Sequence, residues 1–239
     1  MSELRTTGEQ NRDGVLEVRF SLDLAERVPG LLVRPAEPAG PTPLVLIQHP
    51  GTGSKDDPFV AGAARFWAQQ YGWTCVGLDA PLHGERDVVD PMRLFAGRTR
   101  LDEAVLTQFA AEVSAAIDAM TAAHPVDLAR LGYVGYSLGA MLGVTAIARD
   151  GRFRAASLCL IGEGLMGPAT GPESVVPALA KVAVRLVCKE RDEIVPRAAS
   201  EALYAALPGE KDLVWLPGGH FSIGRDVIDT AADWLRTRL

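Results

Sequence analysis

Short apolar runs alternate along the chain with longer segments in which apolar residues recur at helical spacing. In the segment 102–123, for example, Val105, Phe109, Val113 and Met120 fall on one face of a helix. The apolar runs predict eight strands, over residues 15–22, 30–35, 43–50, 73–81, 131–137, 155–162, 184–190 and 212–217. Helical patterns occupy residues 58–70, 102–123, 138–149, 197–206 and 222–238.

This alternation predicts an α/β fold with a mostly parallel, doubly wound sheet that opens with an antiparallel hairpin. The central runs are nearly continuously apolar, which is typical of strands covered by helices on both faces. We expect one domain over residues 1–239, with a polar N-terminal tail at 1–13. The Gly- and Pro-rich segment 163–180 is either an irregular surface loop or a short lid, and 85–101 is a second candidate pocket wall.

Charge and cysteine content narrow the choice of partners. The net charge is −6 and the basic residues are scattered, so we expect neither nucleic acid nor a membrane as a partner. The first residues are polar, without the apolar region of a signal peptide, and no run approaches the roughly 20 apolar residues of a membrane span. Cys75, Cys159 and Cys188 lie in apolar runs, which indicates buried free thiols, a reducing compartment and a cytoplasmic location. We expect a monomer or a homodimer.

The stretch Gly135-Tyr-Ser-Leu-Gly139 follows an apolar run and opens a helical pattern. A Gly-x-Ser-x-Gly turn between a strand and a helix holds its serine in a strained conformation at the carboxyl end of the sheet. The Leu138 amide, at the start of the helix, would face developing negative charge. Ser137 is therefore a candidate nucleophile, and the alternative is a tight turn with an incidental serine.

A serine nucleophile needs a base, and the base needs an acid that orients it. His220 follows the last expected strand, and Asp192 follows the strand before it, so both lie at the same sheet edge as Ser137. Glu163, after another strand, is the competing acid, whereas Glu190 and Glu193 are expected to be solvated. The other three histidines are interpreted as structural, at positions 49, 83 and 124. Asp79, which also ends a strand, is interpreted as a cap for the loop that leads to residue 83.

A second backbone donor for an oxyanion would come from the glycine-rich loop 49–57. Pro50 has no N–H, so Gly51 is the first choice and Thr52 the second, alongside Leu138. The alternative is a phosphate-binding loop, which would need a Gly-Lys-Ser/Thr ending that this loop lacks.

Five stretches occur in the order found in the α/β-hydrolase superfamily: "HPGTGSKDD", "DAPLHGERD", "GYSLGA", "ERDEIVP" and "GGHF". Together they resemble small bacterial carboxylesterases akin to dienelactone hydrolases and feruloyl esterases. The resemblance implies Ser137 as nucleophile, Asp192 as acid and His220 as base, with oxyanion donors at Leu138 and at Gly51 or its neighbour. Two departures from the family pattern are Pro50 and Lys189, which stand where glycine is common.

The sequence therefore predicts a serine hydrolase that cleaves a small or medium-sized carboxylic ester through an acyl-enzyme, without a metal or an organic cofactor. Tyr136, Leu165 and Met166 are candidates for the lining of the substrate pocket. The same residues could also cleave thioesters, amides or carbon–carbon bonds, and a non-catalytic binding module is the alternative from a different class.

Overall fold

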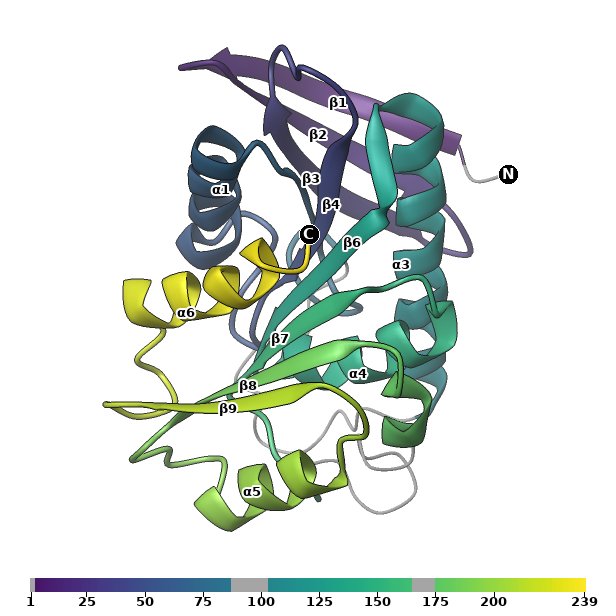
Figure 1. The fold of residues 1–239 in the computed structure, drawn as a ribbon. Coiled ribbons are helices and arrows are strands. Elements are labelled where there is room, and N and C mark those ends of the chain that lie inside the picture. The colour runs from purple at the N-terminus through teal and green to yellow at the C-terminus, as the bar shows by residue number, and fades with distance from the viewer. Residues whose placement is uncertain (1–2, 87–102, 165–174) are drawn as a thin grey trace.

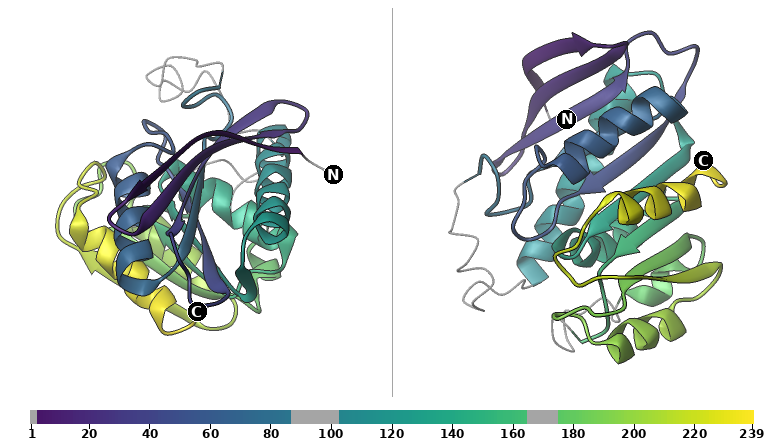
Figure 2. Two further views of the ribbon diagram at one scale, coloured as in Figure 1. Left: turned by 90° about the horizontal axis from the view of Figure 1, so that it is seen from above. Right: turned by 90° about the vertical axis from the view of Figure 1, so that its left-hand side faces the viewer.

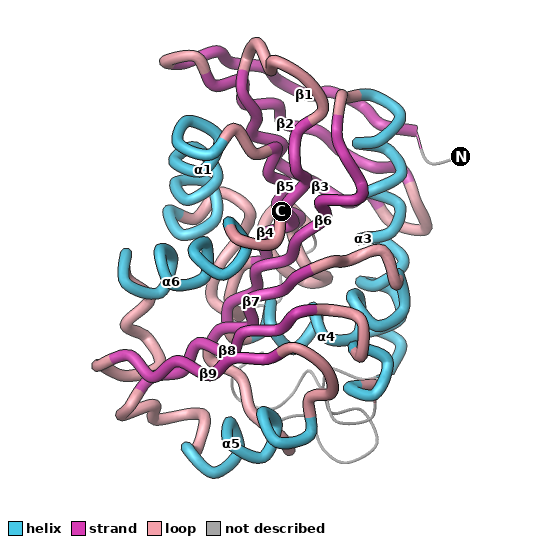
Figure 3. The backbone as a smooth tube through the Cα atoms, viewed as in Figure 1, coloured by secondary structure: helices cyan, strands magenta, loops and turns pink. Residues whose placement is uncertain are grey.

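The computed structural model describes residues 3–86, 103–164 and 175–239, and these residues form one nine-stranded sheet with helices on both faces (Figures 1 and 3). The strands lie side by side in the order β1-β2-β3-β5-β4-β6-β7-β8-β9. They are β1 Glu3–Arg12, β2 Val15–Asp23, β3 Arg27–Pro35, β4 Thr42–Gln48, β5 Thr74–Leu78, β6 Val126–Tyr136, β7 Ala155–Cys159, β8 Ala183–Lys189 and β9 Lys211–Leu216.

The strands from β5 to β9 in this order are parallel to one another, and the first three strands are antiparallel to their neighbours. The predicted α/β sheet with an antiparallel opening is thereby confirmed. Every residue of β4 is buried, as its continuous apolar run indicated. In a parallel sheet the carboxyl ends of the strands share one edge, so the loops that follow β4, β6, β8 and β9 leave the sheet on the same side.

The helices form two layers (Figure 2). α1 (Ala63–Tyr71) and α6 (Arg225–Arg236) cover one face, and α3 (Glu103–Ala123) and α4 (Leu138–Asp150) cover the other. α5 (Arg197–Ala206) packs against β8 and β9. Two short helical turns complete the described elements, a π-helical one at Pro58–Gly62 (η1) and a 3-10 one at Val176–Leu179 (η3).

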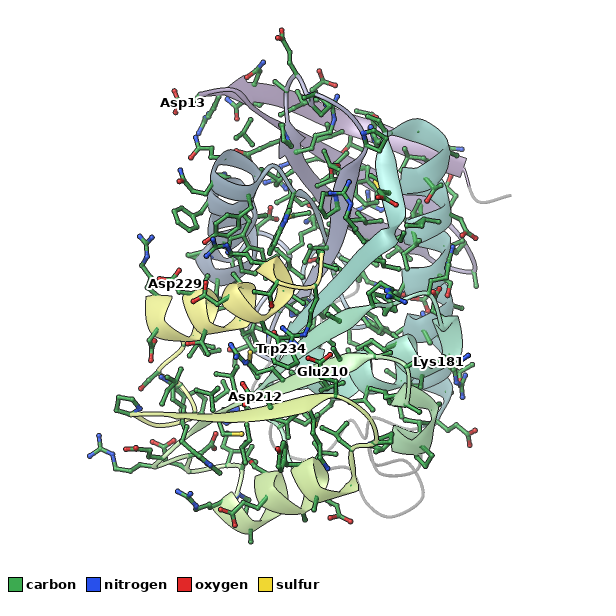
Figure 4. All side chains as sticks on the ribbon, in the orientation of Figure 1. Asp13, Lys181, Glu210, Asp212, Asp229 and Trp234 are labelled. Atoms are coloured by element: carbon green, nitrogen blue, oxygen red, sulfur yellow. The ribbon has the colours of Figure 1, made fainter. Side chains whose placement is uncertain are left out.

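Each layer has its own apolar core. On the α3 side, Phe109, Val113 and Met120 are fully buried, as their spacing in the sequence predicted. On the α6 side, Trp234 lies between the helix and the strands (Figure 4), and its Nε1 donates to the Ala183 carbonyl over 3.1 Å. Side chains of this size stabilise the fold by about 1.5–3 kcal/mol each when fully buried.

Several boundaries differ from the sequence prediction, and two of these differences bear on the edge of the sheet and on the loop of His220. Residues 3–12, expected to belong to a polar tail, form β1, which pairs with β2 at the edge of the sheet and gives nine strands instead of eight. The last helix begins at Arg225 instead of residue 222, because residues 217–224 form a loop that carries His220.

Two expected pocket walls are only partly described. Of the segment 163–180, residues 165–174 lie outside the described residues, and η3 packs against α4 with Val176 and Leu179 buried. Of the segment 85–101, only Glu85 and Arg86 are described. Within the described ranges, no helix has the length and apolar character that crossing a membrane requires.

Candidate active site

Ser137 stands at the sharp turn between β6 and α4. Its backbone has φ 51° and ψ −110°, a conformation that side-chain-bearing residues rarely adopt. Hydrogen bonds on both sides hold this turn: the Ser137 N–H donates to the Cys159 carbonyl over 2.8 Å, and the Ser137 carbonyl accepts from the amides of Ala140 and Met141 over 2.9 and 3.0 Å. The strained turn is thus fixed by β7 on one side and by the first turn of α4 on the other.

Two glycines allow α4 to approach both β6 and the end of β4 so closely. A Cβ atom on Gly135 would lie 2.4 Å from the Gly139 carbonyl oxygen, and one on Gly139 would lie 2.4 Å from the Gln48 carbonyl oxygen. Both obstacles are backbone atoms, which cannot rotate away. Gly139 also brings the start of the loop after β4 against the start of α4, next to Ser137.

The three side chains expected to act together are in hydrogen-bonding contact. Ser137 Oγ lies 2.8 Å from His220 Nε2, and His220 Nδ1 lies 2.9 Å from both carboxylate oxygens of Asp192. The side chains of His220 and Asp192 are each 4% exposed. With Nδ1–H directed at the carboxylate, Nε2 is the acceptor for the serine proton, which is the tautomer that a general base requires.

The loop after β8 holds Asp192 in place. Oδ1 of Asp192 accepts the backbone N–H groups of Ile194 and Val195 over 2.9 and 2.7 Å. Glu163, the competing acid, is exposed, and its side chain makes no hydrogen bond within the described part of the chain. The geometry therefore places Asp192 on His220, and not Glu163.

Glu193 is solvated as expected, and it also makes a contact that the sequence did not predict. Its side chain is exposed, yet Oε2 accepts the backbone N–H of His220 over 2.7 Å. This hydrogen bond lowers the pKa of Glu193, so the carboxylate stays ionised. The sequence could not predict this contact, because the Glu193 carboxylate accepts from a backbone amide, and almost every residue type carries one.

Two histidines orient the peptide groups of the candidate oxyanion loop. Ala80 N donates to His49 Nε2 over 3.1 Å, so the proton of this imidazole is on Nδ1, which donates to the Pro50 carbonyl over 2.8 Å. His83 Nε2 lies 3.0 Å from the Gly51 carbonyl. In a trans peptide group the N–H and the carbonyl point in opposite directions. His49, which contacts the Pro50 carbonyl, therefore directs the Gly51 amide away from itself. His83, which contacts the Gly51 carbonyl, does the same for the Thr52 amide.

The amides of Gly51 and Thr52 donate to no other residue in the described ranges, so both are free to bind an oxyanion. Leu138 is the first residue of α4, and its N–H therefore has no partner inside the helix. β4 lies beside β6 with Gln48 opposite Gly135, so the loop leaves the sheet next to Ser137. Gly51, Thr52 and Leu138 all remain candidate donors.

A buried ion pair joins this loop to the segment after β5. Lys55 Nζ lies 3.1 Å from Asp79 and 2.6 Å from Glu85, and the Lys55 side chain is 1% exposed. The Asp79 carboxylate also accepts the backbone amides of Lys55 and Glu85, at 3.0 and 2.8 Å. Burial disfavours the charged amine, but the surrounding carboxylates outweigh it and raise the pKa of Lys55. Asp79 is thus the loop cap that its position predicted.

Of the three residues expected to line the substrate pocket, the structure describes one. Tyr136 does not line a pocket: its side chain is fully buried in the core beneath α1 and α6, with its ring 6.1 Å from that of Phe59. Burial raises the pKa of Tyr136 well above its usual value. Leu165 and Met166 lie outside the described residues.

Replacing Gly139 by alanine should lower the free energy of unfolding by about 1–3 kcal/mol, because the new Cβ meets the Gln48 carbonyl. Urea unfolding measures the change. Gly62→Ala is the matched control: Gly62 has φ −67° and open space around its Cβ position, so this variant should be as stable as the wild type or slightly more stable. Equal stability of the two variants would show that the crossing is not tight.

Protonation of His49 should destabilise the fold in mild acid. Burial lowers the pKa of His49 from 6.5 to about 4, so between these values the unfolded chain binds a proton that the folded chain does not. The free energy of unfolding should fall as the pH drops through this window, by at most about 1.4 kcal/mol per pH unit from this group. Urea unfolding of wild type and His49→Gln across the window tests this, and identical pH slopes would contradict it.

Of the comparisons with known proteins, the one with solved structures bears on the fold. No family model matches the chain, and no curated protein matches it in sequence. Among solved structures, a cold-adapted esterase from an Arctic intertidal metagenomic library superposes with a TM-score of 0.79 at 26% identity, over 98% of each chain.

Two further structures are more distant in sequence. Acetyl xylan esterase 1 from Thermoanaerobacterium sp. JW/SL YS485 has a TM-score of 0.71 at 14% identity, over 99% of this chain and 88% of its own. An S-formylglutathione hydrolase from Agrobacterium tumefaciens has a TM-score of 0.72 at 14% identity, over 98% of this chain and 99% of its own. Both similarities extend over almost the whole chain. The chain therefore has the α/β-hydrolase fold.

Proposed function

We propose that this protein is a serine hydrolase that cleaves carboxylic esters of small or medium size through an acyl-enzyme. The observation that carries the proposal is the unbroken hydrogen-bonded series from Ser137 Oγ through the His220 ring to Asp192, at 2.8 and 2.9 Å. The similarity to solved esterases supports the choice of an ester as substrate.

In the proposed reaction each group has a role that the geometry supports. His220 Nε2 takes the proton of Ser137 as its oxygen attacks the ester carbonyl, and Asp192 stabilises the imidazolium that forms. The Leu138 amide and one amide of the loop after β4, Gly51 or Thr52, donate to the oxyanion. His220 then protonates the leaving alcohol, and water releases the acyl group in a second cycle of the same steps.

Ser137 is the nucleophile in this proposal, and a cysteine is not. All three cysteines are buried and free. Burial raises the pKa of each thiol, to about 11 for Cys188 and higher still for Cys75 and Cys159, so none forms a thiolate at neutral pH. Free thiols also support, as part of the same proposal, a reducing compartment such as the cytoplasm.

The decisive experiment combines fluorophosphonate labelling with turnover of p-nitrophenyl esters of increasing acyl length. Wild type should label and hydrolyse the shorter esters. Ser137→Ala should not label, and its kcat should fall by about 10⁶-fold. Asp192→Asn should lower kcat by about 10⁴-fold, because the histidine loses its tautomer.

Glu163→Gln is the matched control for the acid, because it changes the competing carboxylate and should leave kcat unchanged. Labelling of Ser137→Ala as fast as wild type would contradict the nucleophile assignment. A wild type that neither labels nor hydrolyses would favour a non-catalytic binding module. Hydrolysis of thioesters in preference to matched esters would correct the substrate class.

A further inference from the structure

The segment that carries Asp192 and the segment that carries His220 run side by side beyond the ends of their strands. β8 and β9 pair in parallel as far as Lys189 and Leu216. The pairing continues into the loops, where the Glu190 N–H donates to the Leu216 carbonyl over 2.9 Å and the Arg191 N–H to the Gly218 carbonyl over 3.0 Å. The loop at 217–224, called here the histidine loop, is thus held along one side by its neighbour.

Lys189 anchors the first residue of the histidine loop. Its side chain is 1% exposed, and its Nζ donates to the Pro217 carbonyl over 3.1 Å and lies 2.7 Å from the Asp226 carboxylate. A buried ammonium group is costly unless it is paired and hydrogen-bonded, and these two partners supply both. Asp226 belongs to the first turn of α6, so Lys189 joins the end of β8 to both ends of the histidine loop.

Glu193 holds a second part of the histidine loop, the backbone amide of His220. Its Oε2 accepts the His220 N–H over 2.7 Å, a short distance typical of a charged acceptor. Its other oxygen occupies the space beside Gly219, where a Cβ atom would lie only 2.2 Å away. Gly218 has φ +107°, so the backbone just before His220 follows a path open mainly to glycine. The Glu193 carboxylate therefore packs directly against the backbone at Gly219, where the absence of a side chain leaves room for it.

We propose that Lys189 and Glu193 are positioning residues for His220. They fix the backbone of the histidine loop so that the imidazole reaches Ser137 while its other nitrogen faces Asp192. This inference rests on the proposed function and adds two residues to it. A misplacement of about 1 Å costs on the order of 100-fold in rate, so loss of either anchor acts on kcat more than on substrate binding.

Kinetics of matched variants test the assignment. Glu193→Ala and Lys189→Met should each lower kcat for a short p-nitrophenyl ester by at least about tenfold, with KM within about twofold of wild type. Glu193→Gln keeps an acceptor for the His220 amide, so its kcat should recover to within about threefold of wild type.

The controls come from the same region of the chain. Glu190→Ala removes an exposed carboxylate of the same loop, and Lys181→Met an exposed lysine; both should behave as wild type. If Lys189→Met does not fold, Asp226→Ala removes the other half of the ion pair from a partly exposed position. Wild-type kcat in Glu193→Ala, or a loss in Glu193→Gln equal to that in Glu193→Ala, would overturn the proposal.

A spectroscopic readout separates this proposal from the proposed function. The hydrogen-bonded Nδ1–H of His220 should give a downfield proton resonance that is absent from His220→Gln. Glu193→Ala should shift or broaden it, and Glu193→Gln and Glu190→Ala should retain it. An unchanged resonance in Glu193→Ala would overturn the positioning role even in an active enzyme. A changed resonance in a protein that hydrolyses no ester would contradict only the proposed function.

Discussion

The close crossing of β6 and α4 is the constraint on which the candidate site depends. Glycine at position 135 leaves room for it, and glycine at position 139 leaves room for the end of β4 beside α4. Ser137, between these two glycines, has a strained backbone conformation with positive φ. Such a conformation costs on the order of 1–3 kcal/mol, which the surrounding hydrogen bonds offset. Because β4, β8 and β9 run parallel to β6, the loops with the oxyanion donors, the acid and the histidine arrive at this same turn.

Much of this arrangement follows from sequence pattern alone. Each of the eight expected strands exists, because long apolar runs have few alternatives to a covered sheet. Ser137, Asp192 and His220 each follow the end of a parallel strand, so the order of strands and helices alone places them at the same edge of the sheet. β1 escaped prediction because its side chains are mostly exposed, so residues 3–12 show no apolar alternation, and only pairing with β2 makes them a strand.

The features of the site that the sequence did not predict have two physical origins. Tyr136 precedes Ser137 in the chain, but successive residues of a strand point to opposite faces, so its ring enters the core under α1 and α6. Glu193 meets a backbone amide and Lys189 a backbone carbonyl, partners that carry no residue identity. Contacts of this kind depend on the path of two loops through space, and no periodicity in the sequence reports that path.

The polar character that concealed β1 has a consequence for association. β1 is an outermost strand, and an outermost strand offers unpaired backbone groups to any other chain. Here charged side chains line it, Arg5 pairs with Asp23 at 2.9 Å, and a bulge between Thr6 and Gly8 interrupts its register. Adding another strand would strip water from these charges and would have to match an irregular ladder. The charges and the bulge of β1 therefore disfavour the pairing of its free edge with a strand of another copy of this chain.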